Sequence, residues 1–344
     1  MSRPEVFPAL KTISIVTHAY NEEENIEALY LRVREIMSGY PHYRYEHIFI
    51  DNASSDATVP ILKRIAAADR HVKIIVNARN FGHIRSPIHA LFQATGDAVI
   101  SIASDFQEPP DLIPEMIRAW EEGFPMVLCL KQSSGEHGLM FWLRQKYYRL
   151  VERLSSVRTI QNYTGFGLYD RRVIEIVKSF HDPYPYFRGI IAEIGLPAKY
   201  LDFHQPARRF GITKNNWYTL YDIAMLGITN LSKVPLRLTV FSGFIGAVLS
   251  FLTGMAYLIY KLLFWQRFTL GIAPIVIGIF FISSIQLVFM GIIGEYVGAI
   301  HTQVLHRPYV TELERINFEY PPETPSATTP ALTGGTPLPV AQTT

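Results

Sequence analysis

Four short polar clusters follow apolar, β-rich runs in the first 110 residues, and they carry the groups best suited to chemistry. Carboxylate and amide oxygens suit Mg²⁺ or Mn²⁺, because these cations prefer oxygen ligands and bridge phosphate groups. Such a set could hold a phosphorylated ligand and stabilise the charge on a departing diphosphate. The clusters are Tyr20-Asn21-Glu22, Asp51-Asn52, Asn77-Ala78-Arg79-Asn80 and Ser104-Asp105.

The elements that must position these clusters alternate between strand and helix patterns from residue 10 to about residue 210. Strand patterns cover 12–16, 45–51, 72–77 and 97–104, and helical patterns cover 22–38, 57–68, 83–94 and 109–122. This alternation implies βαβ units and a mostly parallel sheet, hence an α/β fold. Ligands of such sheets bind at the carboxyl ends of the strands. We therefore expect the four clusters at one edge.

Several functional classes are disfavoured by the sequence. Neither a G-x-G-x-x-G nor a G-x-x-x-x-G-K-[ST] pattern is present, which argues against a dinucleotide enzyme or a P-loop NTPase. The formal charge of +2 is too near neutral for a nucleic-acid partner. The single cysteine, Cys129, forms no intramolecular disulfide and suits a reducing compartment. Its apolar neighbours predict a buried, small hydrophobic side chain.

Two apolar segments, at about 238–260 and 270–293, have no charged residue in their interiors and are long enough to cross a bilayer. The alternative is a pair of buried core helices, but uncharged runs of this length are rare in soluble folds. Glycines in both segments allow close helix contact. The pattern therefore predicts a transmembrane hairpin.

The segments that flank the hairpin also have distinct compositions. An apolar helical stripe within 211–237, flanked by Lys and Arg, fits either a helix at the surface of an anionic membrane or a core-packing helix. The Pro-, Thr- and Ala-rich tail at 321–344 predicts disorder. The N-terminal residues lack the apolar core of a signal peptide, so we expect the first domain, and after two spans residues 296–320, in the cytoplasm.

The motifs VTHAYNEEENI, IDNASSDAT, NARNFGH and SDFQEPPDLIPEM occur in this order. With the hairpin and the GEYVG run after it, the chain resembles family-2 glycosyltransferases of the GT-A (Rossmann-like) fold over about residues 10–310. It is most similar to the polyprenyl-phosphate glycosyltransferases, which include dolichol-phosphate mannose synthase and the bactoprenol glucosyltransferases. The resemblance implies a domain layout with a GT-A domain at 1–210, a juxtamembrane region at 211–237 and two membrane spans at 238–295. A cytoplasmic segment at 296–320 and the tail at 321–344 complete this layout.

The resemblance implies an activity and partners. A sugar would move from a nucleotide-sugar donor to a polyprenyl (undecaprenyl) phosphate at the cytoplasmic face of the inner membrane, by one inverting displacement. A phosphate acceptor is already ionised near pH 7, so positioning and charge stabilisation could suffice without a catalytic base. Relatives with such a hairpin often assemble, which leaves a homo-oligomer open.

The resemblance also implies roles for individual residues. Asp105 would be the catalytic carboxylate and a ligand of Mg²⁺ or Mn²⁺, with Gln107 as a supporting ligand. Arg209 and Lys214 would bind the lipid phosphate. The nucleotide-sugar would be bound by Tyr20, Asn21, Glu22, Asp51, Asn52, Arg79, Asn80 and Ser104.

Three departures from the family pattern bear on these roles. Ala103 stands at the first acidic position of a DADLQDPP-like motif, and one carboxylate with an amide binds a divalent cation more weakly than two carboxylates. The run 164–168 replaces a GDFRL-like segment and lacks its Asp and Arg; the following Asp170 is as well explained as a helix N-cap. His18 replaces a common Pro.

Two other functions therefore stay open. One is transfer to a sugar or lipid hydroxyl, which would need a base. The other is a catalytically weak relative that binds nucleotide-sugars or assembles with membrane partners.

Overall fold

A computed structural model describes residues 10–132, 160–206, 225, 233–264, 272–305 and 307–318. Its N-terminal domain contains one eight-stranded sheet with the order β7-β5-β6-β4-β1-β2-β3-β8. The strands are β1 (Thr12–Ala19), β2 (Arg44–Asp51), β3 (Val72–Asn77), β4 (Ala98–Ala103), β5 (Met126–Gln132), β6 (Tyr163–Asp170), β7 (Ala198–His204) and β8 (Glu312–Ile316). The helices of this domain are α1 (Ile26–Ser38), α2 (Thr58–Ala68), α3 (Gly82–Gln93), the 3₁₀ turn η1 (Pro110–Leu112), α4 (Ile113–Glu121), α6 (Arg171–Ser179) and α7 (Phe187–Ile194).

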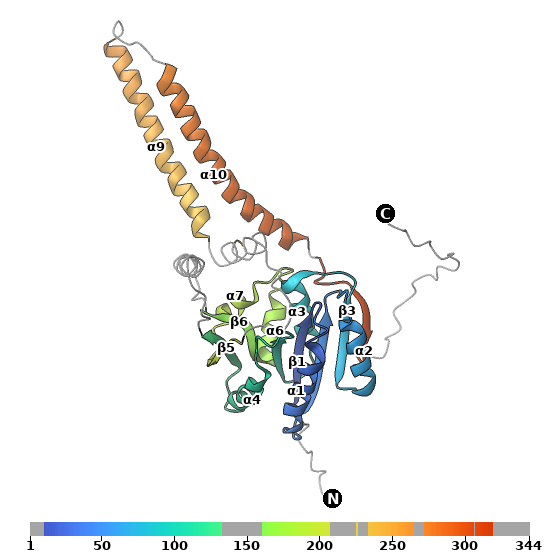
Figure 1. The fold of residues 1–344 in the computed structure, drawn as a ribbon. Helices are drawn as coiled ribbons and strands as arrows, with labels where there is room; N and C mark the ends of the chain where they lie inside the picture. Colours follow the sequence, from blue (N-terminus) through green and yellow to red (C-terminus); the bar gives the residue numbers. More distant parts are fainter. Residues whose placement is uncertain are drawn as a thin grey trace, which may run out of the picture.

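The predicted βαβ half of the domain is confirmed. Strands β1 to β4 form parallel ladders, with β1 between β2 and β4. The sheet as a whole is mixed, however, because β6 and β8 run antiparallel to their neighbours. In Figure 1 the chain enters at the bottom and β1 runs upward, so the carboxyl edge of the parallel strands faces the base of the helical hairpin.

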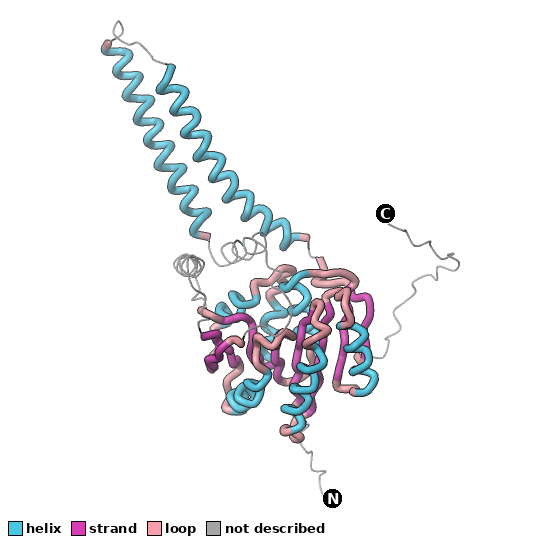
Figure 2. The backbone as a smooth tube through the Cα atoms, in the orientation of Figure 1, coloured by secondary structure: helices cyan, strands magenta, loops and turns pink. Residues whose placement is uncertain are grey.

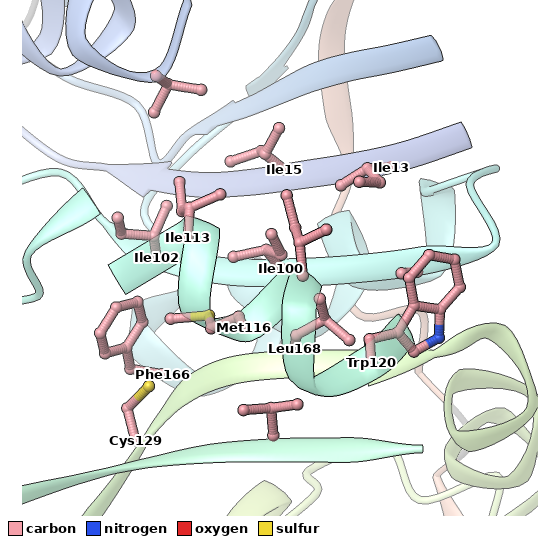
Figure 3. Packing of buried hydrophobic residues seen from close by; sticks show 14 of the residues in the cluster. Ile13, Ile15, Ile100, Ile102, Ile113, Met116, Trp120, Cys129, Phe166 and Leu168 are labelled. Carbon is pink, nitrogen blue, oxygen red and sulfur yellow. The ribbon is translucent and has the colours of Figure 1, made fainter. Parts of the chain in front are cut away.

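The sheet is covered by helices on both faces. Helices α1 and α4 pack on one face over the cluster in Figure 3, where Ile13, Ile15 and Ile100 are fully buried. Helices α3, α6 and α7 pack on the other face. Cys129 is buried in the first cluster, as predicted, and burial raises the pKa of its thiol far above the usual range. It is therefore a packing residue.

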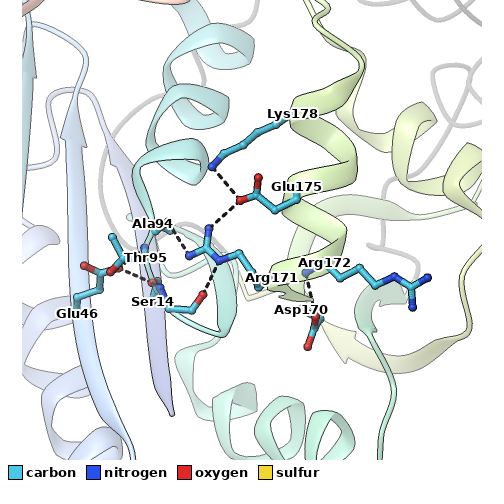
Figure 4. A network of polar contacts seen from close by, with 10 residues as sticks. Ser14, Glu46, Ala94, Thr95, Asp170, Arg171, Arg172, Glu175 and Lys178 are labelled. Carbon is cyan, nitrogen blue, oxygen red and sulfur yellow. Dashed lines mark hydrogen bonds and ion pairs between the residues drawn. The ribbon is translucent and has the colours of Figure 1, made fainter. Parts of the chain in front are cut away.

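A polar network ties the start of helix α6, which directly follows β6, to the connection between α3 and β4 (Figure 4). The Arg171 guanidinium donates to the backbone oxygens of Ala94 at 2.8 Å and Gly96 at 3.0 Å. Asp170 is the N-cap of α6, the alternative that the sequence left open, since its carboxylate accepts the Arg172 backbone N–H at 2.9 Å. Asp170 is thus accounted for by local structure.

Replacement of Arg171 by alanine is expected to destabilise the domain by about 1–3 kcal/mol, because two buried carbonyl groups lose their charged donor. The neighbouring Arg172→Ala variant is the matched control, since Arg172 is exposed and alanine keeps the capping N–H. Thermal unfolding of the full chain in detergent measures the difference. Equal unfolding midpoints for Arg171→Ala and Arg172→Ala would contradict the stabilising role given to the Arg171 hydrogen bonds.

Two long helices, α9 (Val234–Leu263) and α10 (Ile272–Val304), project from the domain side by side (Figure 2). Apolar windows at Val234–Ala256 and Gly278–Val304 have mean hydropathies of 1.8 and 1.7 and are almost entirely exposed. Each helix exceeds the predicted span, and 30 residues of α9 reach about 45 Å against a hydrocarbon core of about 30 Å. These features rule out the core-helix alternative for the described residues and are typical of membrane association.

After α10 the chain returns to the sheet, which was not predicted. Strand β8 pairs antiparallel with β3 and closes that edge. Its charged side chains are paired with the domain: Glu312 with His89 at 2.6 Å, and Glu314 with Lys63 at 2.5 Å. The C-terminal segment therefore contributes a strand to the N-terminal domain.

Candidate active site

The loops that follow β1 and β2 are joined to each other at the carboxyl edge of the sheet. The Asn21 backbone N–H donates to Ser54 Oγ at 2.8 Å, and Asn21 Oδ1 accepts the Ser55 N–H at 2.8 Å. The Glu22 N–H donates to Thr58 Oγ1 at 2.9 Å. Helix α1 begins at Ile26, later than predicted, because Asn25 and Ile26 first turn back to the Glu22 carbonyl. The polar cluster after β1 is therefore held outside the helix.

Asp51 is fully buried at the end of β2. Its carboxylate accepts the backbone N–H of Ser54 at 2.9 Å and also the Ser54 hydroxyl. Burial raises the pKa of Asp51, while the bonds from Ser54 oppose that shift. The carboxylate thus fixes the turn after β2, and its predicted contact with the nucleotide-sugar stays a prediction.

Asn52 and Asn80 lie together, as expected from the parallel strands, but their side chains are engaged with the protein. Asn52 Nδ2 donates to Asn80 Oδ1 at 2.9 Å, and Asn52 Oδ1 accepts the Phe81 backbone N–H at 2.8 Å. The exposed Arg79 guanidinium stacks 4.0 Å from the centre of the Phe81 ring. The two asparagines therefore shape the loop after β3, while Arg79 stays at the surface.

Three loops at this edge contain a residue with positive φ that is not glycine. These are Asn21 at 56°, Ala53 at 61° and Phe106 at 58°, after β1, β2 and β4 respectively. Ala and Phe adopt this left-handed conformation at a cost of about 1–2 kcal/mol. Strained backbone of this kind concentrates at functional sites. The carboxyl edge of the sheet, where the sequence predicts the ligand site, thus also contains strained backbone.

The loop after β4 carries the predicted cation ligands. Ser104 and Asp105 are largely buried, and Asp105 Oδ1 accepts the Gln107 backbone N–H at 3.1 Å. Within the described ranges no group of three or more His, Cys, Asp and Glu side chains is spaced to hold a metal ion. One carboxylate with substrate phosphate oxygens is still a common set for Mg²⁺. The donors present fit that arrangement, in which Asp105 would hold the cation and the cation would neutralise diphosphate charge.

A cavity of about 250 Å³ lies beyond this loop, between strands β4 and β6 and helices α3 and α7. Burial lowers the pKa of His18, with Asp105 opposing the shift. Burial raises the pKa of Glu108 to about 7, against the hydrogen bonds that its carboxylate accepts. The residues with polar side chains that line the cavity are His18, His83, Ser101, Glu108, Thr164, Tyr186 and Arg188.

None of the residues predicted to bind the donor lines this cavity; they lie around the β1, β2, β3 and β4 ends. Sequence analysis missed Glu108, Thr164 and Arg188 as site residues. The signal for Glu108 was present, since it is the acid directly before Pro109-Pro110 in the same motif as Asp105. The predicted lipid-phosphate ligands Arg209 and Lys214, most of the juxtamembrane region and the tail lie outside the described residues.

A mixed α/β sheet with a polar carboxyl edge, an acidic loop after β4 and an adjoining cavity is the arrangement expected of an α/β enzyme that binds its ligand at the strand ends. Residues 14–191 match the family description "Glycosyl transferase family 2", and the chain belongs to that family. The GT-A fold and glycosyltransferase class predicted from the motifs are therefore confirmed.

Two curated relatives and one solved structure are similar to the chain. It is 33% identical to a bactoprenol glucosyl transferase of Shigella phage SfV, over 88% of this chain and 99% of the relative. It is 31% identical to an uncharacterized glycosyltransferase of Synechocystis, over 90% of this chain and 97% of that relative. Glucosyl-3-phosphoglycerate synthase from Mycobacterium tuberculosis, in complex with Mn²⁺, UDP and phosphoglyceric acid, covers 64% of this chain and 76% of its own, with 18% identity and a TM-score of 0.44.

Proposed function

We propose that the protein transfers a sugar from a nucleotide-sugar to a polyprenyl phosphate at the cytoplasmic face of the inner membrane. The bactoprenol glucosyl transferase relatives support this acceptor class, and they match the chain through the hairpin. Mg²⁺ or Mn²⁺ held by Asp105 and Gln107 is part of the proposal. The sugar and the nucleotide are to be identified by experiment.

The observation that carries the proposal is the attachment of the strand-end edge to the hairpin. The segment that leaves α10 lies against the loop after β3: the Ala78 N–H donates to the Thr311 oxygen at 2.9 Å. Arg85, near the start of α3, donates to the Pro308 oxygen at 3.4 Å. If the hairpin spans the bilayer, these bonds keep the edge near the surface where a lipid phosphate lies.

The proposed chemistry needs few protein groups. A phosphate oxygen of the lipid attacks the anomeric carbon as the bond from that carbon to the β-phosphate oxygen breaks, and the electron pair leaves with the nucleoside diphosphate. The configuration inverts. No proton has to be removed from an ionised phosphate, so the absence of an acidic side chain at Gly165 is compatible with turnover.

The test uses the full chain in lipid vesicles that contain undecaprenyl phosphate and Mg²⁺ or Mn²⁺. A panel of UDP-glucose, UDP-N-acetylglucosamine, UDP-galactose and GDP-mannose is supplied, and extracted lipids are analysed by mass spectrometry. We expect one donor to yield a lipid-linked sugar. Tight nucleotide binding without product from any donor would favour the catalytically weak alternative and contradict the proposal.

A further inference from the structure

The carboxylate of Glu108 is anchored from two sides at the polar end of the cavity. The Ala103 backbone N–H donates to its Oε2 at 2.7 Å, and the Thr164 hydroxyl donates to its Oε1 at 2.9 Å. Each carboxylate oxygen has two lone-pair sites. Beyond these two bonds, one acceptor site on each oxygen is left for a ligand in the cavity that Glu108 lines.

The positions next to this carboxylate are small, which keeps the space beside it open. Ala103 and Gly165 line the same cavity. Gly165 has a φ of +108°, a conformation that other residues adopt only with strain, and a Cβ there would meet nothing closer than Phe187 at 3.8 Å. The backbone therefore keeps position 165 without a side chain, although there is room for one.

The cavity has the character of a sugar site. Its volume of about 250 Å³ is roughly eight times the share of one water molecule in the liquid, so it accommodates a ring and not only an ion. Pro87, Leu91 and Phe187 give it an apolar wall, and Glu108 and Arg188 give it polar groups. A hexose likewise presents C–H faces and hydroxyl edges, and small-molecule sites combine apolar walls with a few placed polar groups.

We propose that Glu108 binds the transferred sugar by accepting hydrogen bonds from two adjacent hydroxyl groups, one on each carboxylate oxygen. Glu108 is then a specificity-determining residue that favours a sugar with a free vicinal diol over its deoxy analogues. The inference rests on the proposed function, because it assumes a nucleotide-sugar donor. It assigns the cavity to the sugar and the strand-end loops to the nucleotide.

Calorimetric titration of the full chain in detergent distinguishes the contribution of the sugar to binding affinity from that of the nucleotide. Each donor of the panel is compared with its own nucleoside diphosphate, for wild type, Glu108→Gln and the exposed control Glu115→Gln. Glutamine can keep both anchors, with its oxygen toward the Ala103 N–H and its amide donating to Thr164, but it loses one outward acceptor. At pH 8, where the Glu108 carboxyl with its pKa of about 7 is mostly ionised, we expect Glu108→Gln to bind the donor about 10–100-fold more weakly, because one bond to a charged acceptor is lost. Its affinity for the diphosphate should be unchanged.

A second measurement varies the donor. Donor analogues that lack one of the two hydroxyls should bind wild type about 10-fold or more weakly, and Glu108→Gln should discriminate less between donor and analogue. Equal donor affinity for wild type and Glu108→Gln, or an equal loss of donor and diphosphate binding, would overturn the inference. If wild type binds a diphosphate but no donor and forms no product, the proposed function itself fails, independently of Glu108.

Discussion

Replacement of Asp105 by asparagine is expected to lower the rate of sugar transfer by about 100-fold or more. Loss of one preorganised group that stabilises developing charge commonly has an effect of this size. Asp105 is the only acidic residue left in the 103–107 segment, because Ala103 replaces the first acid of the family pattern. No second carboxylate within residues 103–107 can therefore compensate.

The matched control for this variant is Asp111→Asn. Asp111 is exposed and paired with Arg32 on the surface, a contact of little energetic consequence. Rates of lipid-linked sugar formation are measured at several Mg²⁺ and Mn²⁺ concentrations, with the unfolding temperature as a check on folding. Asp105→Asn with near-normal activity and an unchanged metal requirement would refute the metal-ligand assignment.

Replacement of Gly167 by alanine is expected to destabilise the domain strongly, by about 3 kcal/mol or more. A Cβ at this position in β6 would lie 2.3 Å from the backbone oxygen of Val127 in β5. A backbone atom in a paired strand cannot move away as a side chain can, and overpacking of a core already costs about 1–3 kcal/mol. The missing Arg of the GDFRL-like run is thus explained, since no side chain fits there.

Gly39→Ala is the control for Gly167→Ala. Gly39 has helical φ and ψ angles that alanine adopts, and its Cβ would meet only the Ile36 oxygen, at 3.3 Å. Thermal unfolding in detergent should show a large loss for Gly167→Ala and a small change for Gly39→Ala. Similar midpoints for both variants would mean that β5 and β6 are not packed as described.

The parallel half of the sheet could be predicted because its strands are short apolar runs with clear boundaries. The 72–77 pattern, for example, is β3 without change. Strand β8 could not be predicted, because its sequence, ELERI, is charged and has no strand signal of its own. It forms because the open edge of β3 offers backbone partners and because Lys63 and His89 pair with its acidic side chains.

The candidate site likewise has some features that the sequence pattern predicts and others that depend on tertiary contacts. The clusters at the strand ends were found because parallel strands bring their carboxyl ends to one edge. That Asn52 and Asn80 bind each other could not be read from the chain. Nor could the hydrogen bond from the Ala103 N–H to the Glu108 carboxylate, which closes the loop that contains Phe106 with its φ of 58°.

The most direct test of the central claim is a comparison of two acceptors that differ only in the phosphate. Wild-type protein in vesicles is given its active donor with either undecaprenyl phosphate or undecaprenol at the same surface density. A phosphate acceptor needs no base, whereas an alcohol must lose a proton. We predict lipid-linked sugar from undecaprenyl phosphate and none above background from undecaprenol. Equal or faster transfer to undecaprenol would contradict the account.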